Sequence, residues 1–185
     1  MKLHLGCGTK ILDGWVNLDI DDAFGPDIAH DLEILPWPLD SNAFDEILMN
    51  HVLEHIGATT RIFLGIMKEL YRVSAPNALL KVNVPHPRHD HFLIDPTHVR
   101  PITPELFGLF NLELNQEWQK LGVANSRLAM STGTNFRVEN VRLTPDARFI
   151  DAESRVTVSP DEFRKLARKE LNVVSEYKMT IRVLK

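Results

Sequence analysis

The stretch Lys2–Ile20, KLHLGCGTKILDGWVNLDI, decides how the rest of the chain is interpreted. Apolar and polar residues alternate over its first positions, which is typical of a β-strand. The turn Gly6-Cys7-Gly8 follows, and a second strand-like run, Val16 to Ile20, carries Asp19 near its end. Glycine has no Cβ, so a ligand can approach the backbone closely at this turn. Because an acid at a strand end can accept hydrogen bonds from ribose hydroxyls, the stretch indicates a nucleoside site.

The connection between these two strands is short for a dinucleotide-binding fold. Such folds carry a third glycine where Ile11 stands here, because their helix and strand pack closely. Only Gly6 to Trp15 separate the strands, which is near the lower limit for a parallel crossover. Any helix in this connection is therefore expected to have one or two turns, and an NAD site is disfavoured.

The composition is that of an ordinary globular protein. The 185 residues favour one domain, residues 1–185, with 25% charged residues and 44% in the hydrophobic class. A net charge of −4 gives no general case for nucleic-acid binding, and no apolar run approaches the roughly 20 residues that span a bilayer. Cys7 is the only cysteine and no secretory signal is visible, so we expect a cytoplasmic protein.

Hydrophobic periodicity predicts alternating strands and helices. Strands are expected over Asp27–Asp31, Phe44–Asn50, Ala78–Val84, Phe136–Leu143 and Val173–Leu184, and helices over Arg61–Val73, Thr103 to about Lys120 and Ser159 to about Leu171, with a helical turn through His51–His55. The strand Ala78–Val84 is mostly apolar, as expected for a strand covered on both faces. This alternation indicates an α/β domain with a parallel sheet.

In a parallel sheet, ligands bind beyond the carboxyl ends of the strands. That rule places Gly6–Gly8, Asp19 and Asn50-His51 at one edge of the sheet. The segment Pro85–Pro101, PHPRHDHFLIDPTHVRP, follows another strand and belongs to the same edge. Long ordered connections of this kind are usually functional.

Three motifs together resemble class I S-adenosylmethionine-dependent methyltransferases of the type 11 group. LHLGCG followed by VNLDI looks like their first motif, and LPWPLDSNAFDEILMNHVLEHI is similar to the run around their fourth strand. MKELYRVSAPNALLKVNVP looks like the following helix, turn and fifth strand. The resemblance covers roughly residues 2 to 85, and the three motifs occur in the family's order.

The resemblance implies a fold and a cofactor site. The fold is a Rossmann-like, mostly parallel sheet of seven strands with an antiparallel last strand and helices on both faces. The cofactor is S-adenosyl-L-methionine. The residues carried over to its site are Gly6, Cys7 and Gly8 for the methionine part, Asp19 for the ribose, Asp31 and Leu32 for the adenine, and Asn50 and His51 near the sulfonium. Lys10 departs from the pattern, since many members have glycine there.

The histidine-rich segment supplies candidates for a catalytic base. Histidine suits proton transfer because its unperturbed pKa is near 6.5. The candidate catalytic residues are His86, His91, His98 and Asp95, with His89 and Asp90 as further members of the cluster. Asp95-Pro96-Thr97-His98 also looks like a short motif that some bacterial methyltransferases of this group carry. These side chains could instead satisfy loop backbone groups.

Two other functions stay open on the sequence. Zinc or iron could bind the nitrogen and oxygen ligands of His86–His98, which would make the chain a metal-dependent hydrolase. No metal-ligand pattern of known spacing is present, so no metal ligand is assigned. His51 and His55 lie four residues apart and could face each other, or Glu54 and His55 could simply cap a helix. An inactive nucleoside-binding protein is the other alternative.

The acceptor of the methyl group is expected to be a small molecule or glycan with a hydroxyl or amine. Residues 85–134 are expected to form the acceptor-side loop and helix of the single domain. The partner predictions are no nucleic acid, no membrane span, and a monomer or homodimer.

Overall fold

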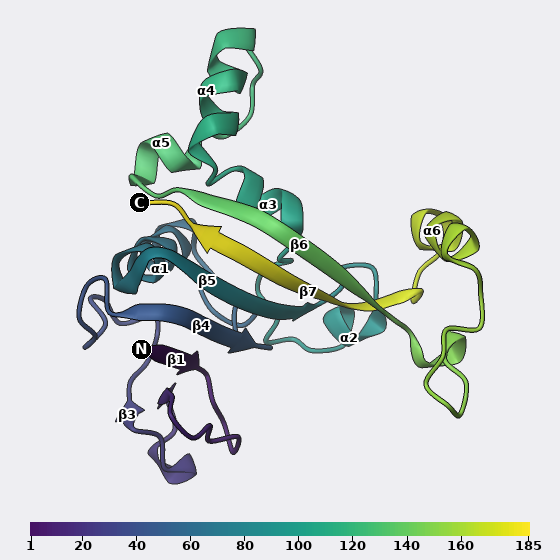
Figure 1. Ribbon diagram of the computed structural model, residues 1–185, viewed down its shortest axis with the longest axis horizontal. Helices are drawn as coiled ribbons and strands as arrows, with labels where there is room; N and C mark the ends of the chain where they lie inside the picture. The colour runs from purple at the N-terminus through teal and green to yellow at the C-terminus, as the bar shows by residue number, and fades with distance from the viewer.

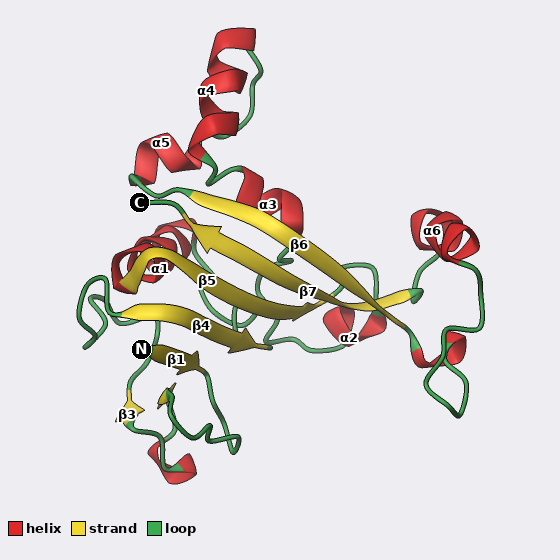
Figure 2. Ribbon diagram, in the orientation of Figure 1, coloured by secondary structure: helices red, strands yellow, loops and turns green.

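The computed structural model describes residues 1–185 as one seven-stranded sheet with short helices around it (Figures 1 and 2). The strand order is β3-β2-β1-β4-β5-β7-β6. Neighbouring strands from β3 to β5 are parallel, and β7 is antiparallel to both β5 and β6. This topology confirms the predicted seven-stranded sheet with an antiparallel last strand.

The predicted strands are present with small shifts in their ends. They are β1 (Lys2–Leu5), β2 (Val16–Asp19), β3 (Ile28–Ala29), β4 (Phe44–Asn50), β5 (Ser74–Pro85), β6 (Phe136–Pro145) and β7 (Val174–Val183). The start of β5 differs most, because a strand was expected from Ala78 but β5 begins at Ser74 and includes Pro76. The register with β4 shifts between Phe44 and Glu46, and Asn77 takes a positive φ of 65°. This irregularity accommodates a proline that a regular ladder would exclude.

The connection between β1 and β2 contains turns and no helix, in keeping with its short length. The side chain of Asn17 holds this loop together. It accepts a hydrogen bond from the Leu12 N–H at 3.0 Å and donates to the carbonyls of Leu12 and Trp15 at 3.1 and 3.2 Å. Local side-chain bonds of this kind compete with helix formation.

Helix α1 (Thr60–Val73) provides most of the helical cover of the sheet. Thr59 caps its N-terminus by accepting a hydrogen bond from the Ile62 N–H. Its apolar stripe is buried, as the spacing predicted, and the stripe comprises Phe63, Ile66, Met67, Leu70 and Val73. These side chains pack in one core with apolar residues of the central strands.

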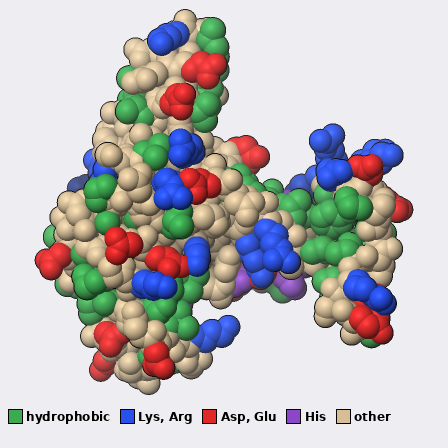
Figure 3. Space-filling view, viewed as in Figure 1, with side chains coloured by type: hydrophobic (Ala, Val, Ile, Leu, Met, Phe, Trp, Pro, Cys, Tyr) green, Lys and Arg blue, Asp and Glu red, His purple; other side chains and the backbone are tan.

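The two faces of the sheet are covered unequally. The register aligns Leu3, Ile47 and Leu80 across neighbouring strands, and all three are fully buried in the core. On the opposite face Glu46 contacts the ammonium groups of Lys2 and Lys81, which are half exposed. The strand Ala78–Val84 was expected to be buried on both faces, but only one of its faces is buried. Figure 3 shows charged side chains spread over the side of the molecule that it presents.

The segment between β5 and β6 contains four short helices. They are α2 (Asp90–Leu93), α3 (Pro104–Gly108), α4 (Leu112–Leu121) and α5 (Leu128–Thr132). One continuous helix to about Lys120 was expected, but Asn111 interrupts it by capping α4 through the Leu114 N–H. The side-chain amide of Asn111 also donates to the Phe136 carbonyl at 3.0 Å, which ties the break to β6.

The chain between β6 and β7 forms an arm beyond the sheet (Figure 1). It contains the 3₁₀-helix η2 (Ala147–Phe149) and α6 (Pro160–Lys169), while a second 3₁₀-helix, η1 (Asp22–Phe24), follows β2. Ser159 caps α6 through the Glu162 N–H, as its sequence predicted. No helix in the structure has the length and hydrophobicity needed to cross a membrane.

Candidate functional site

The carboxyl ends of the parallel strands bring most of the predicted site residues to one edge. Leu5 pairs with Leu18 of β2 and with Met49 of β4. Gly6 therefore follows β1 between the ends of these two strands, where Asp19 and Asn50 lie. The sheet-edge rule thus places the glycine turn and both polar strand ends together.

The glycine turn is shaped by two positive φ angles, 61° at Gly6 and 51° at Gly8. A Cβ at Gly6 would lie 2.4 Å from Cγ2 of Val52, whereas one at Gly8 would meet nothing within 4 Å. Gly6 is therefore required both by its backbone conformation and by the packing of Val52. Cys7 lies between them, and burial, followed by the charge of Asp19, raises the pKa of its thiol.

The Asp19 carboxylate holds the glycine turn through backbone N–H groups. Its Oδ2 accepts from the Gly8 N–H at 2.7 Å, and its Oδ1 accepts from the Asp21 N–H at 3.1 Å. The residue is only 7% exposed. Each carboxylate oxygen has two acceptor positions, so one position on each oxygen stays available for a ligand hydroxyl.

A cavity of about 120 Å³ opens directly beside Asp19. Its lining includes the predicted residues Gly6, Asp19, Asp31 and Leu32, together with Ile20, His30, Val52 and Ile56. These last four residues were not predicted as site residues from the sequence. Ile20 carried a usable signal, because it is a large apolar residue directly after the strand-end acid, and it is 67% exposed.

The loop that carries Asp31 and Leu32 is fastened to α1. Asp31 accepts a hydrogen bond from the Glu33 N–H at 2.8 Å, and the Trp37 indole donates to the Leu32 carbonyl at 2.9 Å. Glu69 of α1 accepts from the Trp37 N–H at 2.8 Å. The adenine-side residues predicted from the sequence therefore lie on a backbone that is held in place.

Asn50 and His51 end β4 and contact β5 and β7. The Asn50 side chain accepts from the Asn83 amide at 2.9 Å. His51 adopts a positive φ of 55°, which is uncommon outside glycine and is often found at functional sites. Its ring lies between two carboxylates, with Nδ1 3.2 Å from Glu54 and Nε2 2.9 Å from Glu176. The hydrogen bond with Glu54 is the largest cause of the raised pKa of His51.

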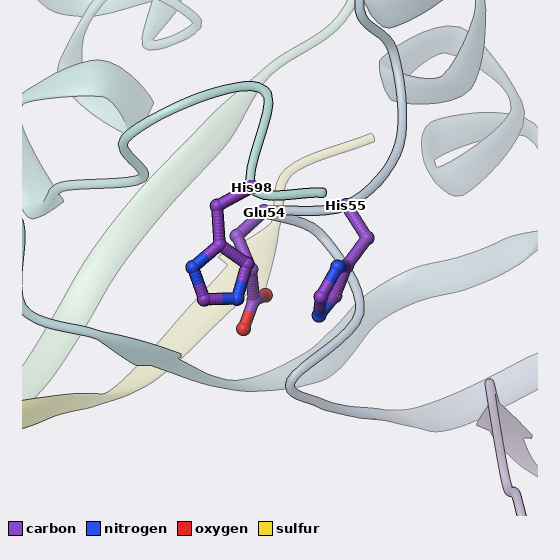
Figure 4. Close-up of side chains that lie close together, drawn as sticks. All are labelled: Glu54, His55 and His98. Atoms are coloured by element: carbon purple, nitrogen blue, oxygen red, sulfur yellow. The ribbon is translucent and has the colours of Figure 1, made fainter. Parts of the chain in front are cut away.

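The turn Val52–Ile56 lies between the 120 Å³ cavity and the segment that carries His98. It consists of turns, so the predicted helical turn through His51–His55 is wrong, and His51 contacts Glu54 and not His55. Val52 and Ile56 line the 120 Å³ cavity. Glu54 and His55 instead point toward the ring of His98 (Figure 4). The reading of Glu54 and His55 as helix caps is therefore also wrong, since no helix begins there.

The histidine-rich segment does not gather into one ligand set. His86 packs against the ring of Tyr177 at 4.7 Å, and burial, followed by the nearby Arg88 and His89, lowers its pKa. His89 is buried and pairs with Asp146 at 2.9 Å, and the ring of the exposed His91 lies 4.2 Å from it at a tilt of 57°. A metal site made of the whole His86–His98 cluster, which the hydrolase alternative requires, is absent from the structure.

Asp95 and His98 are brought to the turn after β4. The Thr97 hydroxyl donates to Asp95 Oδ1 at 2.6 Å, and this bond is the largest cause of the lowered pKa of the Asp95 carboxyl. His55 Nδ1 lies 2.9 Å from the same hydroxyl oxygen. The rings of His55 and His98 are 4.5 Å apart. Of the four candidate catalytic residues, Asp95 and His98 therefore lie beside the turn that carries Glu54 and His55.

Four larger cavities lie away from this edge, and two of them exceed 400 Å³. One, of about 500 Å³, is a shallow polar hollow that includes Ser41, Tyr71 and Lys185. The other, of about 460 Å³, lies in the arm between β6 and α6, where apolar side chains gather (Figure 3). Neither cavity contains a strand-end acid or a glycine turn, so size alone does not locate the candidate site.

The fold is that of class I S-adenosylmethionine-dependent methyltransferases. A methyltransferase from Archaeoglobus fulgidus is 17% identical and superimposes with a TM-score of 0.58 over 98% of this chain and 85% of that one. A putative methyltransferase from Listeria monocytogenes is 13% identical, with a TM-score of 0.56 over 100% and 91%. The 1,6-didemethyltoxoflavin-N1-methyltransferase of Burkholderia thailandensis, solved with S-adenosylhomocysteine, is 12% identical, with a TM-score of 0.52 over 100% and 71%.

No protein-family model matches the sequence, and neither does any curated protein. At these low identities the structural likeness establishes the fold alone. Any function has to be inferred from the residues at the sheet edge.

Proposed function

We propose that this protein is an S-adenosylmethionine-dependent methyltransferase. The observation that carries the proposal is the cavity beside Asp19, which combines a buried strand-end acid, a glycine turn and a second acid, Asp31, at the carboxyl edge of a methyltransferase fold. The three sequence motifs lead to the same edge independently of the comparison with solved structures.

The residues around the cavity fit the nucleoside part of this cofactor. The free acceptor positions of Asp19 suit the two ribose hydroxyls, and hydrogen bonds to an ionised acceptor are the stronger kind. Asp31 has one oxygen bonded to the Glu33 N–H and a second that can accept from the adenine amino group. Ile20 and Ile56 supply apolar walls for the base.

The size of the cavity limits what it encloses. At about 120 Å³ it is smaller than the roughly 300–1,000 Å³ of typical ligand pockets. It therefore takes part of the nucleoside, and the rest of the cofactor would extend along the open glycine turn. At Gly8 there is free space for this approach, since nothing lies within 4 Å of where a Cβ would be.

When bound, S-adenosylmethionine supplies a methyl group that its positive sulfonium already activates. The protein's task is then to align the acceptor with that group, and alignment can supply about 7–11 kcal/mol of the barrier. His51 lies between the carboxylates of Glu54 and Glu176 at the end of β4, where the resemblance places the sulfonium.

Residues 85–134 are proposed to form the acceptor side of the site, with a small molecule or glycan hydroxyl or amine as acceptor. His98 and Asp95 lie beside the turn after β4 and are the candidate catalytic residues best placed to act there. A catalytic role of His86 or His91 stays a prediction.

Isothermal titration calorimetry with S-adenosylhomocysteine, with NAD as the control ligand, tests this proposal. We expect micromolar binding of S-adenosylhomocysteine and no binding of NAD. Equal binding of both ligands, or no binding of S-adenosylhomocysteine by folded protein, would overturn the proposed function. A filter assay with S-adenosylmethionine labelled in its methyl group then measures transfer to a panel of hydroxyl and amine acceptors.

A further inference from the structure

Three side chains with metal-binding atoms converge beside the turn after β4. One ligand atom each from Glu54, His55 and His98 lies within 4.8 Å of the other two. Figure 4 shows the carboxylate of Glu54 lying between the two imidazole rings. Glu54 is fully buried, while the two histidines are partly exposed, so the cluster is open toward solvent on one side only.

The Glu54 carboxylate is incompletely satisfied. Its Oε1 contacts His51 Nδ1, but its Oε2 is buried and has no hydrogen-bond partner. Leaving a buried polar atom without a hydrogen-bond partner costs roughly 1–3 kcal/mol. An unpartnered atom of this kind in a native fold points to an ion or another ligand that completes it.

The hydrogen bonds of both rings fix the tautomer that a metal requires. His98 Nδ1 lies 2.9 Å from the Phe92 carbonyl oxygen, which can only accept, so Nδ1 carries the proton. The Thr97 hydroxyl gives its proton to Asp95 and therefore accepts from His55 Nδ1. In the neutral form of each ring, Nε2 is therefore the nitrogen with a free lone pair, and that of His98 lies 3.8 Å from Asp95 Oδ2. Metal-binding histidines characteristically donate their other ring N–H in this way.

Backbone bonds hold the two halves of the cluster together. The carbonyl oxygen of Glu54 accepts hydrogen bonds from the Val99 and Arg100 N–H groups at 2.9 and 3.3 Å. The Arg100 guanidinium donates to the Gly57 carbonyl at 3.1 Å and stacks on Phe63 of α1. The segment that supplies His98 is therefore anchored to the turn that supplies Glu54 and His55.

We propose that Glu54, His55 and His98 bind a divalent transition-metal ion, and that this ion takes an oxygen of the acceptor as a further ligand. One carboxylate and two imidazoles with an open position form the donor set of many catalytic zinc sites. Zinc holds such atoms at about 2.0–2.2 Å, so ligand atoms within 4.8 Å of one another need to approach by only about 1 Å.

This inference rests on the proposed function and narrows it to an oxygen acceptor. A metal-bound hydroxyl has a much lower pKa than a free one and loses its proton to water more readily. The oxygen then forms a bond to the methyl carbon while the carbon–sulfur bond breaks, and the sulfur keeps the electron pair. Val52 and Ile56 of the same turn line the nucleoside cavity, so the cluster is adjacent to the cofactor site.

Calorimetric titration of untagged, chelator-treated protein with Zn²⁺ tests the site directly. We expect about one equivalent to bind the wild type, and at least tenfold weaker binding to His98→Gln and His55→Gln. His91→Gln is the matched control, because it removes an exposed imidazole of the same segment and should bind Zn²⁺ like the wild type. Glu54→Gln serves as a third variant if circular dichroism shows that it folds.

Less than a tenth of an equivalent bound to the wild type, or unchanged affinity in folded His98→Gln, would overturn the metal site. Titrating S-adenosylhomocysteine into the same preparations separates this failure from that of the proposed function. Nucleoside binding without metal binding overturns the metal site alone. Metal binding without nucleoside binding supports the site and overturns the methyltransferase proposal.

Discussion

The two sides of the turn Val52–Ile56 are built in different ways. On one side, backbone N–H groups hold the acids of the nucleoside cavity, and apolar side chains close around them. On the other side, side chains bond to side chains from a distant segment, and one buried carboxylate oxygen of Glu54 has no partner. On the first side both oxygens of Asp19 accept hydrogen bonds from the backbone, whereas on the second Glu54 Oε2 accepts none.

The largest effect on stability is expected from adding a side-chain carbon at Gly6, in the glycine turn beside the cavity. In Gly6→Ala the new Cβ would lie 2.4 Å from Val52 Cγ2, and alanine is strained at a φ of 61°. The close contact and the backbone strain together should lower the free energy of unfolding by about 3 kcal/mol. Urea denaturation measures this loss.

Gly8→Ala is the matched control for that substitution. Its φ is also positive, but nothing lies within 4 Å of the added Cβ, so only the backbone term of about 1–2 kcal/mol applies. Equal losses in the two variants would show that Val52 does not pack on the glycine turn as described.

Asp19→Asn should weaken S-adenosylhomocysteine binding by about 10- to 100-fold, because two charge-assisted hydrogen bonds to the ribose become neutral. Asp22→Asn removes an exposed charge three residues along and should bind normally. Calorimetry compares the two variants, and an unchanged affinity in Asp19→Asn would refute the ribose assignment.

On the side of the turn that carries Glu54 and His55, called the polar side below, Thr97→Val removes the hydroxyl that links His55 to Asp95. Without it the His55 tautomer is no longer fixed, and Zn²⁺ affinity should fall by about tenfold. Binding of S-adenosylhomocysteine should stay unchanged in the same sample. A change in nucleoside affinity alone would contradict the division of the turn into two sites.

The smallest effect concerns pH. Burial opposes the charge of Glu69, but hydrogen bonds from Arg72 and the Trp37 N–H outweigh it and lower the pKa of Glu69. Ionised Glu69 therefore stabilises the fold fully above its unfolded pKa of about 4.5, and this contribution is lost as the pH falls through the lower folded value.

Glu69→Gln lacks that contribution, so it should be less stable than the wild type by about 1 kcal/mol at neutral pH. The difference should shrink as the pH falls below about 4.5. Thermal denaturation at several pH values checks this, and a difference that stays constant would mean that Glu69 does not hold the loop of Trp37 through its charge.

The residues around the cavity beside Asp19 could be placed together from the sequence, because this placement needs only the strand assignments. Alternation identified the strands, and the carboxyl ends of parallel strands share an edge, so Gly6, Asp19 and Asn50 could be placed together. Asp31 and Leu32 followed from the resemblance of the motifs. The cavity contains four of these residues.

The polar side could not be predicted because it depends on contacts between distant segments. The bond between His55 and Thr97 joins residues 42 apart, and the contact of His51 with Glu176 joins residues 125 apart. Clustering in the sequence drew attention to His86 and His91, yet their rings pack elsewhere in the structure. Histidines that are close in sequence need not share a site, because loop conformation decides where each ring points.

The most direct test of the account is a crystal structure of the protein with S-adenosylhomocysteine. It should show the ribose hydroxyls bonded to Asp19, the adenine near Asp31, and the sulfur on the side of the turn where Glu54, His55 and His98 converge. A nucleoside bound elsewhere, for example in the apolar cavity between β6 and α6, would contradict it.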